Sequence, residues 1–105
     1  MQVSFSTSLS GIQAAIKRQD VTAHNVANVN TPGYEQIDVM QKEKAGGGVE
    51  ISGLKRTPNP DKEHSNTDLA KEAVEQIQNK NSLKANVNAI KTQDKMLGAL
   101  LDMKG

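Results

Sequence analysis

Residues 7–34 read TSLSGIQAAIKRQDVTAHNVANVNTPGY, and this stretch sets the fold class that we expect. Its apolar residues recur at intervals of three and four, which is the spacing of one face of an α-helix. The helix is expected to end near Val29, because Asn28 and Asn30 tolerate the left-handed conformation and Pro32 disfavours a helical residue before it. The stretch therefore predicts a helix over about residues 7–29 that is followed by a turn.

This first helix carries a narrow apolar stripe. Written as heptads, one row holds Leu9, Ile16 and Ala23, and the other holds Ile12, Gln19 and Val26. Four hydroxyl residues are candidates to cap its start: Ser6, Thr7, Ser8 and Ser10. After the helix, Thr31 to Tyr34 fit a type II turn, since Pro32 presets φ at the second position and Gly33 accepts positive φ at the third.

The pattern of apolar residues changes in the middle of the chain, residues 34–66. Ile37 and Val39 alternate with polar neighbours, and three further apolar residues follow the triple glycine at 46–48: Val49, Ile51 and Leu54. This pattern predicts two short strands in a loose hairpin. Residues 57–61 contain two prolines, which forbid regular strand pairing, and we expect a linker or exposed loop from there through Asn66.

A second, longer helix is predicted over about residues 68–103, with Asn66, Thr67 or Asp68 as its cap. Its apolar residues lie near one stripe: Leu69, Ala73, Ile77, Leu83, Val87, Ile90, Leu97 and Leu101. About 36 helical residues span about 54 Å, whereas the first helix spans about 35 Å. Because the shorter helix covers only part of the longer one, the remainder must be solvated or packed on another molecule.

Together these elements predict a mainly α protein whose N- and C-terminal helices pair as an antiparallel coiled coil around a short irregular or β-hairpin middle segment. The expected division is 1–33, 34–66 and 67–105. The expected helix-packing interface consists of Leu9, Ile12, Ile16, Val26, Leu69, Ile77, Leu83, Val87, Ile90, Leu97 and Leu101. An ordinary intramolecular helical hairpin is the alternative that periodicity alone favours.

The composition argues against several classes of function. Thirteen basic and twelve acidic residues are scattered along the chain, which gives nucleic-acid binding little support. The absence of cysteine excludes thiolate metal sites, and neither His24 nor His64 has a pair of carboxylates at ligand spacing around it. Gly46 to Gly48 lack the Lys-Ser/Thr of a phosphate loop. We therefore expect no metal, no cofactor, no small-molecule substrate and no enzymatic activity.

No apolar run approaches the roughly 20 residues of a membrane-spanning helix, so we expect no membrane span. The N-terminal residues also lack the basic leader and apolar core of a Sec-type signal peptide.

Two segments resemble the bacterial flagellar basal-body rod and hook (axial) proteins, and most closely a short proximal-rod-like member. At the N-terminal end the resemblance rests on Asn25, Ala27, Asn28, Asn30, Thr31, Pro32, Gly33 and Tyr34. At the other end it rests on residues of the second helix that include Ala85, Asn86, Ile90, Leu97 and Leu101. The middle segment, about 33 residues, is shorter than in the larger members of the group.

The resemblance implies a structural subunit that polymerises through its terminal helices and forms the inner tube of the periplasmic rod. It implies passage through the type III export apparatus without a Sec signal, after a transient cytoplasmic stage. The partners would be other axial subunits, the chain itself and the export apparatus. The alternative is a cytoplasmic coiled-coil binding or regulatory protein derived from a rod subunit, which the short middle segment favours.

Overall fold

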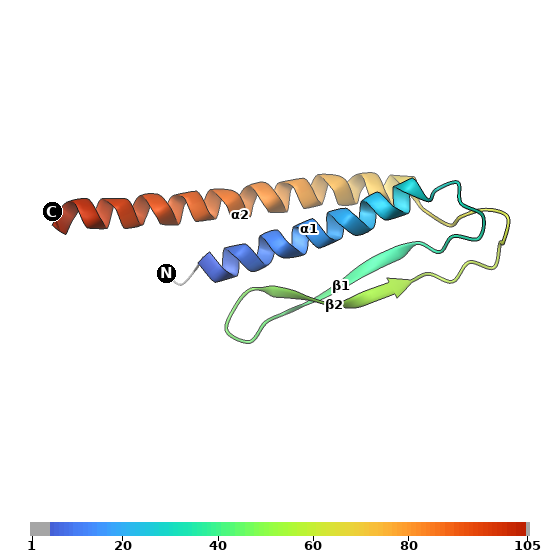
Figure 1. Ribbon diagram of the computed structural model, residues 1–105, viewed down its shortest axis with the longest axis horizontal. Helices are drawn as coiled ribbons and strands as arrows, with labels where there is room; N and C mark the ends of the chain where they lie inside the picture. The colour runs from blue at the N-terminus through green and yellow to red at the C-terminus, as the bar shows by residue number, and fades with distance from the viewer. Residues whose placement is uncertain (1–4, 105) are drawn as a thin grey trace.

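The computed structural model describes residues 5–104, and its elements follow the predicted order. Helix α1 (Phe5–Ala27) leads through strands β1 (Ile37–Glu43) and β2 (Val49–Arg56) to helix α2 (Leu69–Lys104). The helices are antiparallel, and α1 lies between α2 and the β1–β2 hairpin (Figure 1). The molecule is elongated, with extents of 68 × 25 × 14 Å. The prediction of two helices flanking a two-stranded hairpin is confirmed.

Both ends of α1 differ from the prediction. The helix begins at Phe5, so Ser6, Thr7, Ser8 and Ser10 lie inside it and do not cap it. It ends at Ala27, two residues earlier than expected. No described residue other than glycine has positive φ, so the expected left-handed stop at Asn28 or Asn30 is wrong. The His24 carbonyl oxygen accepts two hydrogen bonds from Asn28, one from its backbone amide at 3.1 Å and one from its side-chain amide at 2.8 Å.

The predicted turn after α1 is confirmed. The Tyr34 amide donates to the Thr31 carbonyl oxygen at 3.1 Å, and Gly33 has φ of 74° at the third position. A residue with a Cβ is strained at this φ, so the glycine permits the turn. The chain then enters β1 alongside the end of α1.

The hairpin is antiparallel and contains one irregularity. Val39 pairs with Leu54 and Gln41 with Ile51, with a register shift between Met40 and Gln41. The glycines at 46–48 all adopt positive φ and form the loop. A bulge of this kind increases the local twist. Because the hairpin is twisted, strand β1 contacts α1 near the base of the hairpin, and strand β2 contacts α1 near the loop (Figure 1).

Residues 57–66, predicted as a linker or exposed loop, form a loop that closes on the start of the middle segment. Asn59 is 5% exposed, and its side-chain amide donates to the carbonyl oxygens of Tyr34 and His64. The Gln36 amide donates to Asn66 Oδ1 at 2.7 Å. Asp68 then caps α2, because its carboxylate accepts from the Lys71 amide at 3.1 Å. Of the three candidate caps, Asp68 is the one used.

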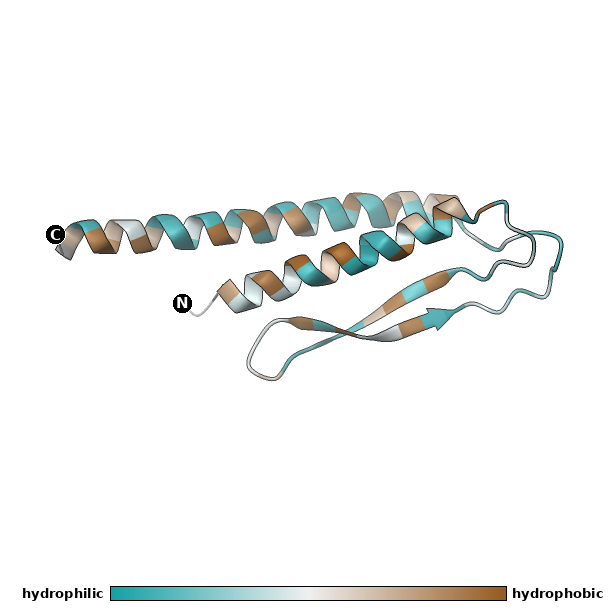
Figure 2. Ribbon diagram, in the orientation of Figure 1, coloured by the Kyte–Doolittle hydropathy of each residue, from teal (hydrophilic) through white to brown (hydrophobic). Residues whose placement is uncertain are grey.

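The buried interior is small. Among the described residues, the buried hydrophobic side chains are Ala14, Ala15, Val21 and Ile37. Buried polar residues are more numerous, namely Ser8, Ser10, Thr22, Asn25, Gln36, Asn59, Glu72 and Asn79. Hydrophobic residues are distributed along both helices, including the part of α2 that extends beyond α1 (Figure 2). The fold therefore relies on close packing and hydrogen bonds, while most of its large apolar side chains stay at the surface.

Candidate functional site

The two helices meet along small and polar side chains that we call the polar seam. Its members repeat at helical heptad spacing: Ser8, Gly11, Ala15, Arg18, Thr22 and Asn25 on α1, and Glu72, Glu75, Asn79, Ser82 and Asn86 on α2. All of them are buried or half-buried. This seam, and not the predicted apolar stripe, holds α1 against α2.

Three contacts set the register of the polar seam: Gly11 against Asn86, Arg18 against Asn79, and Asn25 against Glu72. Each step is seven residues on both helices. The Arg18 guanidinium donates from Nε to Asn79 Oδ1 at 2.9 Å. A Cβ at position 11 would lie 2.6 Å from the Asn86 amide, so glycine permits the close approach there.

Asn25 is the junction between both helices and the hairpin, and it is only 1% exposed. Its side-chain Nδ2 donates to the Ile37 carbonyl oxygen and to Glu72 Oε1, each at 2.7 Å. Its Oδ1 accepts from the Ile37 amide at 2.9 Å and from the Tyr34 hydroxyl at 2.7 Å. The amide of Asn25 thus pairs with both polar groups of Ile37 as a neighbouring strand would, and it anchors β1 to α1.

Glu72 is the most unusual member of the junction, because it carries a carboxyl group and yet the residue is only 2% exposed. Burial raises its pKa above the ordinary 4.5, while hydrogen bonds from Asn25 and Thr22 and the charge of Lys71 act in the opposite direction. The Lys71 ammonium itself bonds Asp38 of β1 at 2.6 Å, which raises the pKa of Lys71. The Lys71–Asp38 ion pair thus joins the start of α2 to β1.

Tyr34 extends this network to the surface. Its hydroxyl lies 2.8 Å from His24 Nδ1 while it donates to Asn25 Oδ1, so the Nδ1–H of His24 is the donor in the first contact. The two rings are 5.6 Å apart. Burial raises the pKa of the Tyr34 hydroxyl, which stays protonated and available as a donor. The chain His24–Tyr34–Asn25–Glu72 connects the turn to both helices.

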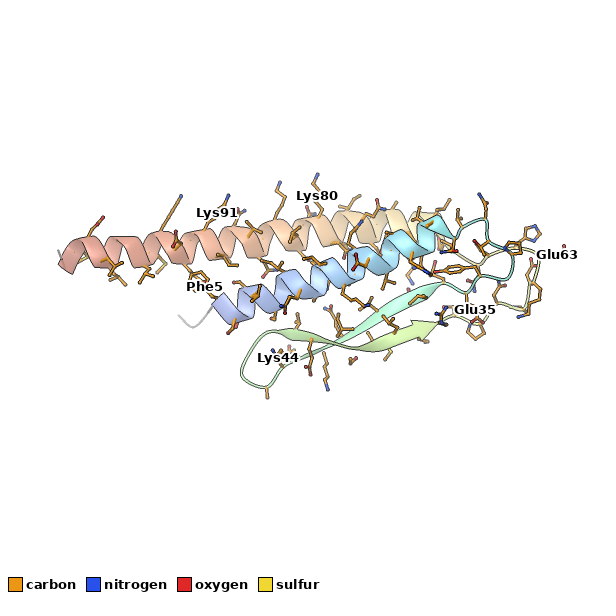
Figure 3. The ribbon with its side chains drawn as sticks, in the orientation of Figure 1. Phe5, Glu35, Lys44, Glu63, Lys80 and Lys91 are labelled. Carbon is orange, nitrogen blue, oxygen red and sulfur yellow. The ribbon has the colours of Figure 1, made fainter. Side chains whose placement is uncertain are left out.

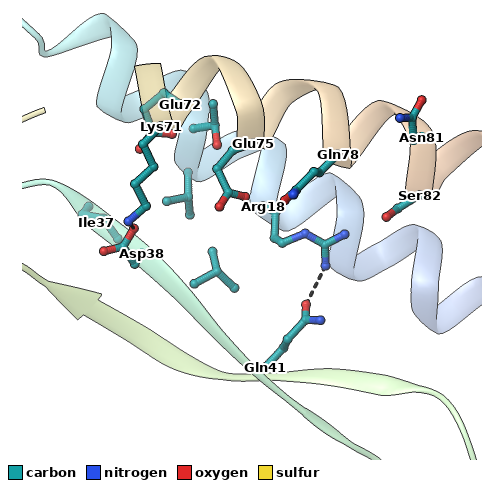
Figure 4. Close-up of a pocket in the computed structure, with 13 residues that line it drawn as sticks. Arg18, Ile37, Asp38, Gln41, Lys71, Glu72, Glu75, Gln78, Asn81 and Ser82 are labelled. Carbon is teal, nitrogen blue, oxygen red and sulfur yellow. Dashed lines mark hydrogen bonds and ion pairs between the residues drawn. The ribbon is translucent and has the colours of Figure 1, made fainter. Parts of the chain in front are cut away.

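Further polar contacts attach the hairpin to the helices. The Val49 amide donates to Ser10 Oγ at 3.1 Å, and Arg18 Nη1 donates to Gln41 Oε1. Figure 4 shows Arg18 pointing toward Gln41 across a groove, with Lys71 beside Asp38 at the other end. Together with Asn25 and Ile37, these pairs hold the hairpin on one side of the helix pair.

The predicted interface residues do not lie in the polar seam. Eight are exposed: Leu9, Ile16, Leu69, Ile77, Leu83, Val87, Leu97 and Leu101. Three are half-buried: Ile12, Val26 and Ile90. All four of those on α1, and Leu83 and Val87 on α2, come one residue after a seam position. Because the helices are antiparallel, such positions on both helices lie on the same side of the pair, opposite the hairpin.

Two apolar surfaces result from this placement. The first, which we call the apolar groove, consists of Leu9, Ile12, Ile16, Leu83, Val87 and Ile90. A depression at one end of it is lined by Ile16 and Leu83 together with Ala15, Gln19, Asp20, Gln76, Asn79 and Lys80. The second, the overhang, consists of Met96, Leu97, Leu100, Leu101 and Met103, which are 47–83% exposed. The overhang belongs to the part of α2 that extends past Phe5, where α1 begins (Figures 1 and 3).

The remaining residues of the N-terminal motif shape the turn. Ala27, Asn30, Thr31 and Pro32 are exposed, and Asn28, Gly33 and Tyr34 are half-buried. On α2, Asn86 lies in the polar seam and Ala85 is exposed. Among these motif residues, Asn25 and Tyr34 make the contacts that join separate elements.

No group of three or more histidine, aspartate or glutamate residues within the described part of the chain is placed to hold a metal ion. None of the described helices combines the length and apolar character needed to cross a membrane.

These features define an elongated protein of paired terminal helices with a small hairpin arm. Two family models match at the two helices: one for a flagella basal body rod protein over residues 5–34, and one for the C-terminal part of flagellar basal body rod FlgEFG proteins over residues 63–103. Together they span more than half of the chain, in the order the family has them. The chain belongs to the flagellar basal-body rod and hook family, whose members are structural components of the basal body. No curated protein matches the chain in sequence.

Sequence reasoning missed the polar seam. Heptad analysis weights large apolar residues, and the seam contains almost none. A signal was present, because Ser8, Ala15 and Thr22 repeat every seven residues, as do Asn79 and Asn86. Small residues at this spacing permit close approach of two helices, which is how the seam could have been found.

Proposed function

We propose that this protein is a structural subunit of the flagellar rod or hook-rod axis that polymerises through its terminal helices after type III export. The observation that carries the proposal is the exposure of apolar rows on both family-matched helices. Contiguous exposed apolar surface of this kind marks an interaction site. Its final location is the periplasmic rod, reached after a transient cytoplasmic stage.

The helix pair fits an antiparallel coiled coil, because the contacts of the polar seam advance by seven residues on both helices. Its apolar rows then serve contacts between subunits. In this assignment residues 1–33 and 67–105 form the axial part and residues 34–66 the outer arm. The eleven predicted interface residues would become buried only in the assembled axis, where its partners are other axial subunits and further copies of the chain.

The energetics suit assembly. A fully buried Leu or Ile contributes roughly 1.5–3 kcal/mol relative to an exposed one. Leu97 is 49% exposed and Leu101 is 61% exposed. Covering them would therefore recover roughly half of that range, about 1 kcal/mol each. The free energy gained is small for one pair of subunits, but it is gained again at each contact along an assembly.

Basal-body purification from cells that express variants tests the proposal. Replacing the half-buried Ile90 or the exposed Leu97 with Asp should leave expression intact and remove the protein from purified basal bodies, because a charge in the interface is costly to desolvate. Val74→Asp is the matched control, since Val74 is exposed at 53% and lies outside the apolar groove and the overhang. Normal incorporation of both interface variants would contradict the proposal.

The alternative is a cytoplasmic coiled-coil binding or regulatory protein derived from a rod subunit, which would hold axial partners or export components without leaving the cell. The short middle segment supports it, because the hairpin arm is only two strands. Cell fractionation separates the two: persistent cytosolic location favours this alternative, and recovery with basal bodies favours the rod subunit.

A further inference from the structure

Four lysines of α2 lie in one line along the side of the helix that faces away from α1. Lys80 and Lys84 are four residues apart, as are Lys91 and Lys95, and about three helical turns separate Lys80 from Lys91. All four are exposed. Figure 3 shows Lys80 and Lys91 pointing away from α1, and the spacing places Lys84 and Lys95 on the same side. We call these four residues the lysine row.

The charge of the lysine row is not balanced by its surroundings. Within residues 5–104, none of its ammonium groups takes part in an ion pair, although Asp20 of α1 lines the same depression as Lys80. No acidic residue occurs between Glu75 and Asp94. Residues 80–95 therefore carry four lysines against one aspartate. They form a basic strip that extends about 23 Å along the helix.

The lysine row lies at an edge of the molecule that no described element covers. Helix α1 lies between α2 and the hairpin, so α2 forms one long edge of the elongated structure (Figure 1). The polar seam occupies the other side of α2, where Asn79 and Asn86 meet α1. An extended partner can therefore approach the row along its whole length.

The chemistry of the row fits a surface of diffuse negative charge. A lysine ammonium is a point charge that needs no fixed geometry, whereas the planar guanidinium of arginine suits bidentate recognition of a single phosphate or carboxylate. The row contains only lysines, and the two arginines of the chain, Arg18 and Arg56, lie on other elements. A bilayer with anionic headgroups presents a flat layer of phosphates, so all four lysines can reach it at once.

Two observations favour a lipid surface over a nucleic acid. The two aromatic residues of the chain both lie outside α2, so the row has no side chain on which bases could stack. Exposed apolar side chains flank the row, because Leu83 comes three residues after Lys80 and Val87 comes four residues before Lys91. Such side chains can enter the boundary between headgroups and acyl chains while the lysines extend to the phosphates, whereas a phosphate backbone offers them nothing.

We propose that the lysine row binds the free chain to a membrane surface rich in anionic phospholipids. Helix α2 lies along this surface and does not cross it, consistent with the finding that no described helix is long and apolar enough to span a bilayer. This binding goes beyond the proposed rod function, because none of the four lysines is among the predicted interface residues.

Vesicle flotation with the full-length protein tests the proposal. The probe vesicles contain phosphatidylcholine and phosphatidylglycerol in equal parts, and the reference vesicles contain phosphatidylcholine alone. The row variant carries Lys80→Gln, Lys84→Gln, Lys91→Gln and Lys95→Gln. The matched control loses the same charge at exposed positions outside α2, through Lys17→Gln, Lys44→Gln, Lys55→Gln and Lys62→Gln. Circular dichroism checks that both keep their helices, as expected because glutamine and lysine have similar helix propensities.

We expect the wild type and the control to float with the anionic vesicles and not with phosphatidylcholine alone. Each lysine near an anionic surface strengthens binding about fivefold, so the row variant should bind the anionic vesicles at least about 100-fold more weakly. Raised salt should release the wild type, because the screening length falls from about 10 Å at 0.1 M to about 3 Å at 1 M.

Three results of the flotation assay overturn the proposal. The wild type does not float with the anionic vesicles, the row variant floats as the wild type does, or the control loses as much binding as the row variant. The last result would mean that net charge alone decides. A labelled DNA duplex and a poly-glutamate peptide are tested at the same salt concentration. If the wild type binds either one more tightly than the vesicles and the row variant does not, the row serves that polyanion and the lipid assignment is wrong.

Discussion

Replacing Asn25 with Ala is the most informative change to the fold. The substitution removes four side-chain hydrogen bonds: two that Asn25 donates, to the Ile37 carbonyl and to Glu72, and two that it accepts, from the Ile37 amide and from the Tyr34 hydroxyl. Ile37 is 7% exposed, so its freed amide and carbonyl groups would stay largely away from water. The variant thus leaves polar groups without their partner on β1, on α2 and in the turn that holds Tyr34.

The magnitude follows from these bonds. Four hydrogen bonds at about 1 kcal/mol net each give a loss of about 4 kcal/mol. The better helix propensity of Ala returns about 0.5 kcal/mol. We expect the free energy of unfolding to fall by about 3.5 kcal/mol, which is a large part of the roughly 5–15 kcal/mol typical of a domain.

Urea denaturation followed by circular dichroism at neutral pH measures this loss. Asn88→Ala is the matched control, because Asn88 is exposed on α2 and gains the same helix propensity. Wild type and control should agree within about 0.5 kcal/mol, as surface substitutions usually do. If Asn25→Ala also falls within that margin, the junction does not hold the fold together and the reasoning is refuted.

Three further predictions follow from neighbouring sites. Glu72→Gln keeps the shape of the side chain and an acceptor oxygen but removes the buried charge. Because burial raises the Glu72 pKa above 4.5, this carboxyl group's contribution to wild-type stability is fully present below pH 4.5 and declines as the pH rises through the raised pKa. The variant should therefore be more stable than the wild type at neutral pH and equally stable in acid, and a gain in stability that is independent of pH would contradict this. Gly11→Leu should cost about 1–3 kcal/mol by forcing the helices apart at Asn86, whereas Gly98→Leu, which meets open space, should not destabilise; equal thermal shifts for the two would argue against the close approach. Gly33→Ala should cost about 1–2 kcal/mol because the residue has φ of 74°, and an unchanged urea midpoint would show that the turn relaxes freely.

Local signals predicted the elements well. The spacing of apolar residues placed both helices within a few residues of their observed bounds, and the alternation around Ile37 and Val39 placed β1. The Pro32-Gly33 pair predicted its turn because a proline φ and a positive φ are properties of single residues. The ends of α1 were harder to predict, because the helix ends at Ala27 without the left-handed residue that the asparagines suggested.

The candidate site was only partly predictable. The resemblance drew attention to Asn25, but no spacing rule shows that its amide pairs with Ile37 and Glu72, which are 12 and 47 residues away. The sequence showed that the apolar residues of both helices recur at helical spacing. Periodicity alone does not say whether such a stripe faces another helix of the chain or the solvent.

By itself, the sequence determined that the chain has two helices of unequal length, a glycine-centred hairpin and a turn at Pro32 and Gly33, because each of these depends on backbone preferences and periodicity within a few helical turns. Only the tertiary structure decided which face of each helix meets the other. Gly11 and Ala15 allow the backbones to come close enough for Arg18 and Asn25 to find partners on α2. The close approach lets the buried polar groups of the polar seam form hydrogen bonds. The larger apolar side chains lie beside the seam on each helix and remain at the surface.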